Sequence, residues 1–391
     1  HKLLSEDPTL ELELSIGDKS AELGNLSLSD SENGAFALRV RGNARKTDEG
    51  YEYHIENCTA AIDGEETDIL VAPFLKQAQR KFIRTISAQA VSLKAEGNQD
   101  HGKINLRTDG TAGELNLDAS YYILPYKSLR LSGQTSFKDL DIGLITGKTD
   151  LGLVSGKIEG KGRTGRRAEC DVKAEISDFF FRGYNYTNID ISANLQNSSQ
   201  LEVRADVNDP SAILHAYTLY TDDADGKRLQ ATAMAANVDF YTLGLTTGRE
   251  GYRFAAKLNA DLDMADFARG HGYIHLNDIR WLDESNKGLR INNFAINANS
   301  KSTPAAIDIQ SDFINGRLEG TYSFNSLVPQ LKTLAAHFVP ALLGDYSTPG
   351  DINPNDFRFN FTLLPSESIS GFFGLPFHIV HDAGDQRTGI T

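Results

Sequence analysis

Three glycines give this chain the spacing of a cofactor-binding turn. Gly160, Gly162 and Gly165 form G-x-G-x-x-G, which in a dinucleotide-binding unit follows a strand and opens a helix. The helix is essential, because its free N–H groups face the pyrophosphate. Here apolar and polar residues alternate from Cys170 to Ile176, which is typical of a strand. We therefore interpret the glycines as a loose turn between two strands and predict no cofactor.

Two further motifs fail on spacing or on ligand type. Residues 146–150 (TGKTD) end like a phosphate-binding P-loop, but the leading glycine, Gly143, is one position too close. Residues 221–226 (TDDADG) are similar to a calcium loop, but Thr221 and Thr232 stand at its first and twelfth ligand positions, where a bidentate Glu is expected at the twelfth. A polar hairpin turn explains this second segment.

The remaining candidates for catalysis are pairs of histidines. His271 and His275 would share one face of a strand, and His378 and His381 lie in a tail. Neither pair has the further ligands that a zinc site needs. The sequence also lacks H-E-x-x-H and G-x-S-x-G, so it predicts neither an enzyme nor a metal site.

Composition narrows the possible partners. Lys and Arg number 39 and Asp and Glu 53, so the net charge is 39 minus 53, or −14. This balance argues against nucleic acid, whose binding needs clustered basic residues. No run of about 18 apolar residues occurs, so no spanning helix is expected. The chain starts at His1 without a signal-like segment, and we interpret it as a fragment or processed form whose anchor would lie outside it.

Cys58 and Cys170 are the only cysteines. One bridge between them is an open alternative, but two half-buried thiols on strands fit the packing habits of free cysteine better. Two cysteines do not decide the compartment.

Alternation of apolar and polar residues is the dominant pattern along the chain and predicts strands with one buried face. Asn-Gly and Asp-Gly pairs, which suit tight hairpins, separate these runs at Asn33-Gly34, Asp63-Gly64, Asp109-Gly110, Asp225-Gly226 and Asn315-Gly316. Strands joined by short turns, without alternating helices, predict an all-β fold built from antiparallel strands. The clearest hairpin is expected to turn at Asn315-Gly316.

Two segments have helical spacing instead. Apolar residues recur at helical intervals in 68–91 and in 326–343, which predicts two short amphipathic helices. Basic residues on the first, including Lys76 and Arg80, would suit contact with a membrane surface. The alternative is that this helix covers a sheet edge or an open core and that its basic residues are simply solvated.

The order of strand motifs resembles the TamB family of AsmA-like bridge proteins, particularly its Bacteroidetes-type members. The segments on which this resemblance is based are LGLVSGKIEG at 151–160, the run from Gly183 to Ile191, and the strand ending at Asn208-Asp209-Pro210. Segments 331–346 and 356–376 resemble the same proteins, and the likeness covers most of 129–377. Each motif is degenerate, so the likeness lies in their order.

The resemblance implies an elongated antiparallel sheet curled into an open apolar trough, continuous over 1–377, with a polar tail at 378–391. It implies a periplasmic bridge, tied to the inner membrane by an N-terminal helix that this chain lacks. Its partners would be phospholipid acyl chains and an Omp85-type (TamA-like) outer-membrane barrel. Such proteins are thought to conduct phospholipid or to assist outer-membrane protein assembly, and have no catalytic residues.

The apolar set of each alternating strand should share one face. We predict that the lipid groove is lined by Leu115, Leu117, Val172, Ile176, Ile189, Ile191, Leu201, Val203, Phe254, Leu258, Ile307, Ile309, Phe357, Phe359 and Phe361. An uncovered apolar sheet is costly, so acyl chains could cover it. The sheet could also cover itself, as a sandwich or a closed barrel.

A surface adhesin or glycan-binding β-protein is the alternative from another class. For that function a platform of exposed rings is expected from Tyr121, Tyr122, Tyr126, Phe179, Phe180 and Tyr184. An enzyme on a β-scaffold is a third alternative, which the motifs above do not favour.

Overall fold

The computed structural model describes residues 8–30, 37–48, 50–62, 89–224, 226–264, 270–323, 356–364, 366–373, 379–381 and 388–390. Strand makes up 75% and helix 4% of these described residues, which confirms the all-β prediction. The chain divides into two compact units, His1–Ser198 and Ser199–Thr391.

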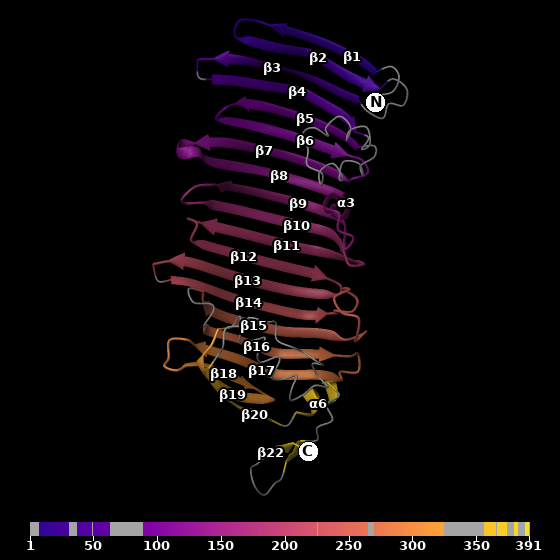
Figure 1. Ribbon diagram of the computed structural model, residues 1–391. Coiled ribbons are helices and arrows are strands. Elements are labelled where there is room, and N and C mark those ends of the chain that lie inside the picture. Colours follow the sequence, from indigo (N-terminus) through magenta and orange to yellow (C-terminus); the bar gives the residue numbers. More distant parts are fainter. Residues whose placement is uncertain are drawn as a thin grey trace. The chain divides into compact units, whose positions relative to one another are not determined.

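The first unit is an antiparallel meander, in which the strands lie side by side in chain order (Figure 1, indigo to magenta). Its described elements are β1 (Pro8–Ile16), β2 (Ser20–Asp30), β3 (Ala37–Thr47), β4 (Gly50–Ile62), β5 (Gln89–Asn98), β6 (His101–Asp109), β7 (Glu114–Leu124), η1 (Pro125–Lys127), β8 (Ser128–Asp141), α3 (Ile142–Thr146), β9 (Leu151–Arg163), β10 (Glu169–Phe181) and β11 (Tyr184–Gln196).

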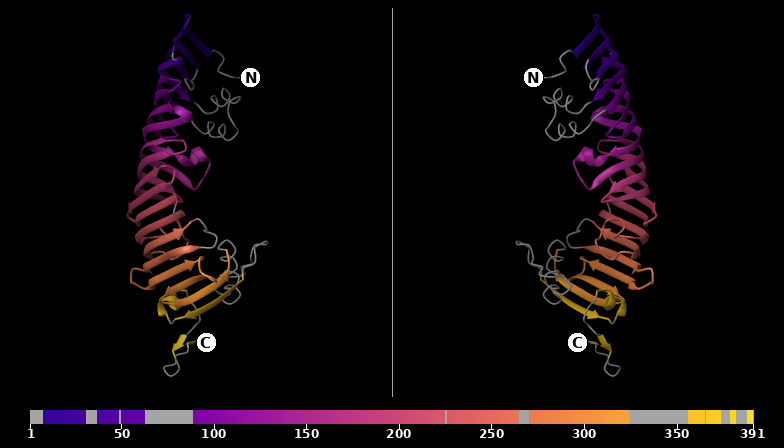
Figure 2. Two further views of the ribbon diagram at one scale, coloured as in Figure 1. Left: turned by 90° about the vertical axis from the view of Figure 1, so that its left-hand side faces the viewer. Right: turned by 90° about the vertical axis from the view of Figure 1, so that its right-hand side faces the viewer.

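The second unit continues this pattern of antiparallel neighbours from β12 to β20 (Figure 2, pink through orange to yellow). Its described elements are β12 (Gln200–Asp209), β13 (Ala212–Asp223), β14 (Gly226–Val238), β15 (Arg253–Asp263), β16 (His271–Leu282), β17 (Gly288–Asn299), β18 (Ala305–Ser311), β19 (Ile314–Thr321), β20 (Asp356–Leu363), α6 (Glu367–Phe373), and the separate pair β21 (Ile379–His381) and β22 (Thr388–Ile390). Within each unit the described pairings join neighbours in the chain, so neither meander closes into a barrel.

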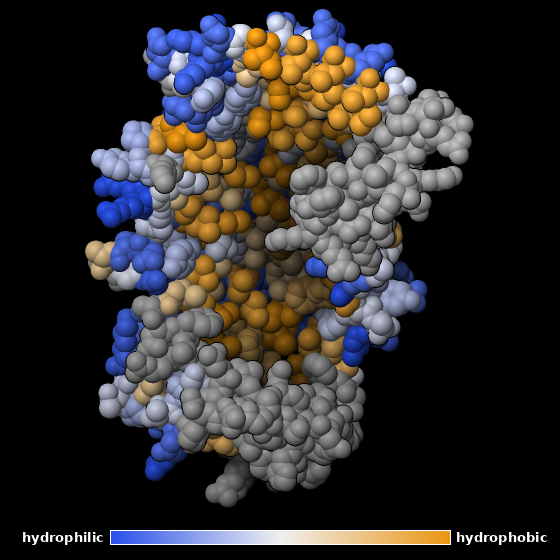
Figure 3. All heavy atoms as spheres, turned by 45° about the horizontal axis from the view of Figure 1, so that its top comes forward, coloured by the Kyte–Doolittle hydropathy of each residue, from blue (hydrophilic) through white to orange (hydrophobic). Residues whose placement is uncertain are grey.

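Alternation places the apolar residues of each strand on one face, and the register aligns them between strands. In the first unit, Leu117 of β7 lies opposite Leu106 of β6 and Thr135 of β8. Figure 3 views a face on which hydrophobic side chains gather between flanks of hydrophilic ones. The other face of the first unit carries ion pairs such as Lys157 with Glu175, whose Nζ and Oε2 atoms lie 2.8 Å apart.

The hairpin turns agree with the sequence in part. β6 ends at Asp109 and Gly110 follows with a φ of 153°, as expected for Asp109-Gly110. β13 and β14 form a hairpin that closes with Asp223 opposite Gly226. Asn33-Gly34 and Asp63-Gly64 lie outside the described residues.

The turn expected at Asn315-Gly316 is misplaced, although the hairpin exists. Both residues lie inside β19, and the chain turns earlier, between Ser311 and Ile314. A Cβ at Gly316 would overlap the ring of Phe361 on β20. This glycine therefore makes room for an aromatic side chain instead of forming a turn.

The loose turn predicted at the three glycines is wrong for two of them. Gly160 and Gly162 lie in β9, opposite Val172 and Cys170 of β10. Gly165 is in the connection to β10, with a φ of 126°. Glycine inside a strand often marks a close approach, and here a Cβ at Gly160 would lie 3.3 Å from Cγ2 of Val172 and one at Gly162 3.2 Å from Cβ of Cys170.

The two predicted amphipathic helices fall largely outside the described residues, which exclude 63–88 and 324–355. The end of the first prediction is wrong, because residues 89–91 begin strand β5. Two short helices, α3 and α6, were not predicted. The Asp141 side chain caps α3 by accepting a hydrogen bond from the Leu144 backbone N–H at 2.7 Å.

Candidate functional site

The first unit presents a face of apolar side chains that crosses all of its strands from β1 to β11. We call it the first apolar face. Six of the predicted groove residues lie on it: Leu115, Leu117, Val172, Ile176, Ile189 and Ile191. One rung of aligned residues runs through Leu12, Leu26, Val40, Cys58, Leu93, Leu106, Leu117, Thr135, Ile158, Ala174 and Ile191.

Much of this face remains accessible. Leu10, Leu12 and Leu14 are 65%, 60% and 50% exposed, and Ile191 is 41% exposed. The other five predicted residues of this unit are half-buried. A contiguous exposed apolar surface is costly in water, and such surfaces often mark protein–protein, membrane or ligand-binding sites.

Polar atoms on the first apolar face are few and placed apart. The hydroxyl of Thr135, in the rung that runs from Leu12 to Ile191, is buried and has no hydrogen-bond partner in the described structure. Cys58 and Cys170 lie on this face as free, half-buried thiols, as the sequence favoured. Burial raises the pKa of the Cys58 thiol, which keeps it protonated and unreactive near neutral pH.

A pair of tyrosines forms the main polar contact on the first apolar face. The hydroxyls of Tyr53 and Tyr121 lie 3.0 Å apart, and Tyr121 donates to the carbonyl of Asn98 at 2.9 Å. The hydrogen bond with Tyr121, helped by burial, raises the pKa of Tyr53 to about 12. Gly102 leaves room for both rings, because a Cβ there would lie 2.7 Å from each tyrosine.

The rings expected to form one glycan platform are divided between two faces. Phe179 and Tyr184 lie on the first apolar face, in a cluster with Phe181 and Tyr186 whose ring centroids are 5.0 to 6.4 Å apart. Phe180 alternates with these neighbours and is 41% exposed. Tyr122 likewise alternates with Tyr121 and stacks on His101, and the fully exposed Tyr126 lies in η1.

The second unit has a corresponding apolar face, which carries the other nine predicted residues. We call it the second apolar face. One rung runs through Val203, Thr218, Ala231, Ala260, Ile274, Ile296, Ile309, Gly316 and Phe361, and the next through Leu201, Tyr220, Leu229, Leu262, Gly272, Ala298, Ile307, Leu318 and Phe359. Phe254 and Leu258, four positions apart on β15, point to this same face. Phe357 of β20 lies opposite Gly320 of β19.

Part of the second apolar face is packed core. Ile307 is 5% exposed and forms a cluster with Leu318 and Tyr322, against which Ile309 and Phe357 pack. Phe359 instead is 48% exposed. The predicted residues of this unit are therefore not all available to a ligand, and Ile307 is a core residue in this structure.

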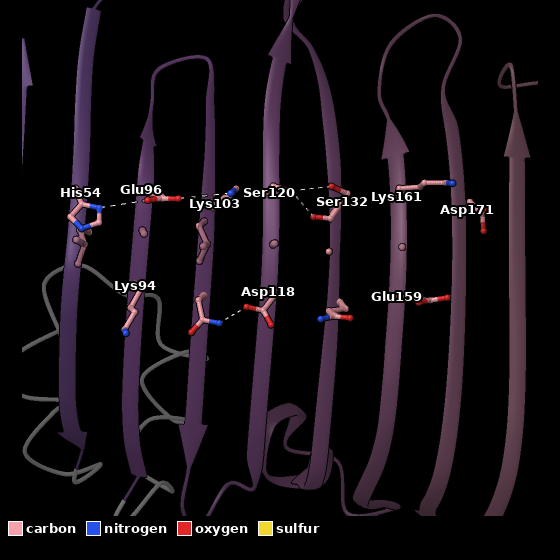
Figure 4. A pocket seen from close by; sticks show the side chains of 18 of the residues that line it. His54, Lys94, Glu96, Lys103, Asp118, Ser120, Ser132, Glu159, Lys161 and Asp171 are labelled. Atoms are coloured by element: carbon pink, nitrogen blue, oxygen red, sulfur yellow. Dashed lines mark hydrogen bonds and ion pairs between the residues drawn. The ribbon is translucent and has the colours of Figure 1, made fainter. Parts of the chain in front are cut away.

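A groove of about 910 Å³ on the polar side of the first unit was not predicted (Figure 4). Two rows of polar side chains flank it, and Ala95, Ala119, Gly133 and Gly160 lie between them. The flanking groups pair with one another across strands: His54 with Glu96, Lys103 with Glu96, Glu159 with Lys173 and Ser120 with Ser132, at 3.0 to 4.0 Å. These contacts pair His54, Lys103 and Lys173 with carboxylates, and they point to no particular ligand.

The histidine and metal alternatives find no further support in the described residues. His275 contacts Asn297 at 3.2 Å and stacks near Tyr273. No group of three or more His, Cys, Asp or Glu is placed to hold a metal ion within the described part of the chain. His378 lies outside the described residues.

No helix in the described ranges is long and apolar enough to cross a membrane. Comparisons with protein-family models, curated proteins and solved structures give no match to this chain. The two apolar faces are therefore the features of the described structure that bear most directly on function.

Proposed function

We propose that the two apolar faces bind phospholipid acyl chains, and that each meander is curled into an open apolar trough that conducts lipid. The single observation that carries this proposal is the rung of apolar residues that continues from Leu12 to Ile191 across β1 to β11. The gathering of hydrophobic side chains in Figure 3 supports it further.

The dimensions of the first apolar face favour a lipid over a small apolar ligand. Strands in a sheet lie about 4.8 Å apart, so the spacings from β1 to β11 add up to roughly 50 Å. One leaflet of a bilayer has a hydrocarbon thickness of about 15 Å, half that of the whole core. The face is thus longer than one acyl chain, which a conduit requires and a simple binding pocket does not.

The setting follows the resemblance to the TamB family and is part of the proposal. The protein would stand in the periplasm as a bridge between the inner membrane and an Omp85-type barrel in the outer membrane. It would conduct phospholipid, assist outer-membrane protein assembly, or do both. The polar faces and the net charge of −14 would keep such a bridge soluble between the membranes.

A charge placed on the first apolar face tests the proposal. Ile191→Asp introduces a carboxylate at the end of the rung that starts at Leu12, opposite Ala174. An acyl chain there would leave the carboxylate without a partner. We expect loss of co-purified phospholipid, measured by solvent extraction and mass spectrometry, with the fold retained in circular dichroism. Ser192→Asp is the matched control, because it adds the same charge on the other face, opposite Lys173.

The second apolar face allows the same comparison. Phe359→Asp changes an exposed ring opposite Leu318, and Asn360→Asp places the charge opposite Arg317 on the other face. Equal phospholipid in all four variants and the wild type would contradict the proposal. Collapse of the fold in both apolar-face variants, with intact controls, would mean that these residues are ordinary core.

A further inference from the structure

A short helix covers part of the second apolar face. α6 places Phe372 against Leu289 and Ile291 of β17, where the phenylalanine is 9% exposed. The Phe372 ring also lies 5.3 Å from the indole of Trp281 on β16. Figure 1 shows α6 beside the start of β17. Phe372, together with Ile369 of the same helix, therefore covers the apolar surface around Trp281.

One arginine fastens the C-terminal end of this helix. The Nη2 atom of Arg249 donates to the carbonyl of Phe372 at 2.7 Å. Its guanidinium lies 3.5 Å from the centroid of the Phe372 ring, and 5.4 and 5.6 Å from those of Tyr252 and Trp281. A planar cation over aromatic rings, with a charge-assisted hydrogen bond, makes a specific attachment.

A second attachment holds the start of the helix to the edge of β17. The Ser368 hydroxyl accepts from the Arg290 N–H at 2.7 Å and donates to the Gly288 carbonyl at 3.1 Å. These are edge groups of β17, since its pairing with β18 begins only at Phe294. Ser368 thus satisfies backbone groups of β17 that no neighbouring strand pairs. Both attachments of α6, at Arg249 and at Ser368, are non-covalent.

A helix of this length depends on such attachments. α6 has seven residues, and an isolated helix that short is not stable in water. It also contains Gly371, and glycine weakens a helix interior. A Cβ at this position would have no atom within 4 Å, so packing does not require glycine there. Loss of the attachment at Arg249 should therefore release the helix without unfolding the strands beneath it.

We propose that α6 is a lid on the second apolar face, latched by Arg249, and that an acyl chain takes the place of Phe372 when the lid opens. This proposal rests on the lipid-binding function proposed above. The uncovered surface would consist of Leu289, Ile291, Trp281 and Ile279, all apolar and already packed together. Trp281 lies opposite Phe254, so this surface continues the second apolar face.

Trp281 is the only tryptophan in the chain, so its fluorescence reports on this position. The full chain is mixed with vesicles that contain phospholipid brominated in the acyl chain, because bromine quenches an indole that it contacts. We expect weak quenching in the wild type and about tenfold more lid opening in Arg249→Ala, the effect of losing roughly one charge-assisted hydrogen bond. Arg249→Lys keeps the charge without the planar stacking and should fall between them.

Arg280→Ala is the control, since it removes an exposed arginine next to Trp281 and should quench like the wild type. If Arg249→Ala fails to fold, Arg249→Lys carries the test. Unchanged quenching in the folded Arg249 variants, while lipid still co-purifies and depends on Ile191, would overturn the lid alone. Exposure of Trp281 to a water-soluble quencher but not to brominated lipid would overturn the acyl occupant. Absence of lipid from every variant and the wild type would overturn both proposals.

Discussion

Leu12 and Leu14 on the first apolar face are 60% and 50% exposed, whereas Ile307 and Leu318 on the second are 5% and 2% exposed. Among the described residues, two of the buried hydrophobic residues belong to the first unit, Ala112 and Val154, and thirteen to the second. Both units alternate apolar and polar residues along antiparallel strands. Alternation therefore sets the direction of a side chain but does not decide whether anything covers it.

The difference arises from what packs on each face. In the second unit, the ring of Phe240, in the connection after β14, packs against Phe254 of β15 and Trp281 of β16, with ring centroids 5.2 and 5.8 Å apart. α6 adds Phe372 to this group. The first apolar face has small residues at several aligned positions, such as Ala119 opposite Gly133. Small side chains leave a surface that is apolar but not filled.

The largest expected difference in stability is between truncating a core residue of the second unit and truncating an exposed residue of the first apolar face. Leu318→Ala removes a side chain packed with Ile307 and Tyr322, and we expect a loss of about 2 to 5 kcal/mol in the free energy of unfolding. Leu12→Ala in the first unit should cost less than about 1 kcal/mol, because that side chain is mostly in water already. Urea unfolding of both variants measures the difference, and equal losses would erase the distinction between the two faces.

The next largest loss of stability is expected when a buried carboxylate in the second unit is replaced. Asp239 is 2% exposed. Burial raises its pKa, but hydrogen bonds from the backbone and hydroxyl of Thr242, at 3.0 and 2.7 Å, and from Arg253 outweigh burial and lower it overall. Asp239→Asn should cost about 1 to 3 kcal/mol near neutral pH.

The stability difference between the wild type and Asp239→Asn should depend on pH in a direction that follows from the lowered pKa of Asp239. A carboxylate whose pKa is lower in the folded state contributes full stability above its unfolded pKa of about 3.9 and loses it as the pH falls through the folded value. The gap between wild type and Asp239→Asn should therefore narrow on acidification below about pH 4. In the first unit Asp150 is exposed and 3.5 Å from Arg182, so Asp150→Asn should cost less than about 1 kcal/mol near neutral pH.

Glycine substitutions test local packing at a smaller scale. Gly316→Ala would drive a methyl group into the ring of Phe361 and should cost about 1 to 3 kcal/mol by overpacking. At Gly160 in the first unit the nearest atom to a new Cβ is Cγ2 of Val172, at 3.3 Å, which can shift. Gly160→Ala should therefore leave the melting temperature nearly unchanged, and a loss as large as that of Gly316→Ala would show a tighter first unit than described.

The smallest effect is expected on the polar side of the first unit. The hydrogen bond from Lys157 to Glu175 raises the pKa of the lysine, but both side chains are more than half exposed. Exposed ion pairs contribute little and are screened by salt. Lys157→Ala should not change the melting temperature at physiological salt, and a clear decrease there would mean that the cross-strand pairs hold the sheet together.

The strand faces could be predicted from the sequence because their signal is local and repeated. Ile189 and Ile191 alternate with polar residues, and the structure places both on one face. The fourteen residues grouped with Ile191 also fall on the two apolar faces. Their role in binding lipid stays a prediction, since a direction on a strand does not identify an occupant.

The misplaced turns had causes that no local pattern contains. Asn315-Gly316 has the residues of a tight turn, but the glycine is needed beneath Phe361, which lies 45 positions later. Gly160 and Gly162 looked like turn residues because glycine weakens a strand considered alone. The helices α3 and α6 span five and seven residues, too few for a helical period to emerge from the sequence.

The meander also determines how the protein can be assembled. Within each unit, described strands pair with strands next to them in the chain, so most hydrogen bonds close short loops and cost little chain entropy. Each new hairpin can therefore dock onto the strands already formed, as repeats do in a solenoid. A chain delivered from one end could fold progressively behind the point of delivery, and its growing end would always offer an unpaired strand to the next segment.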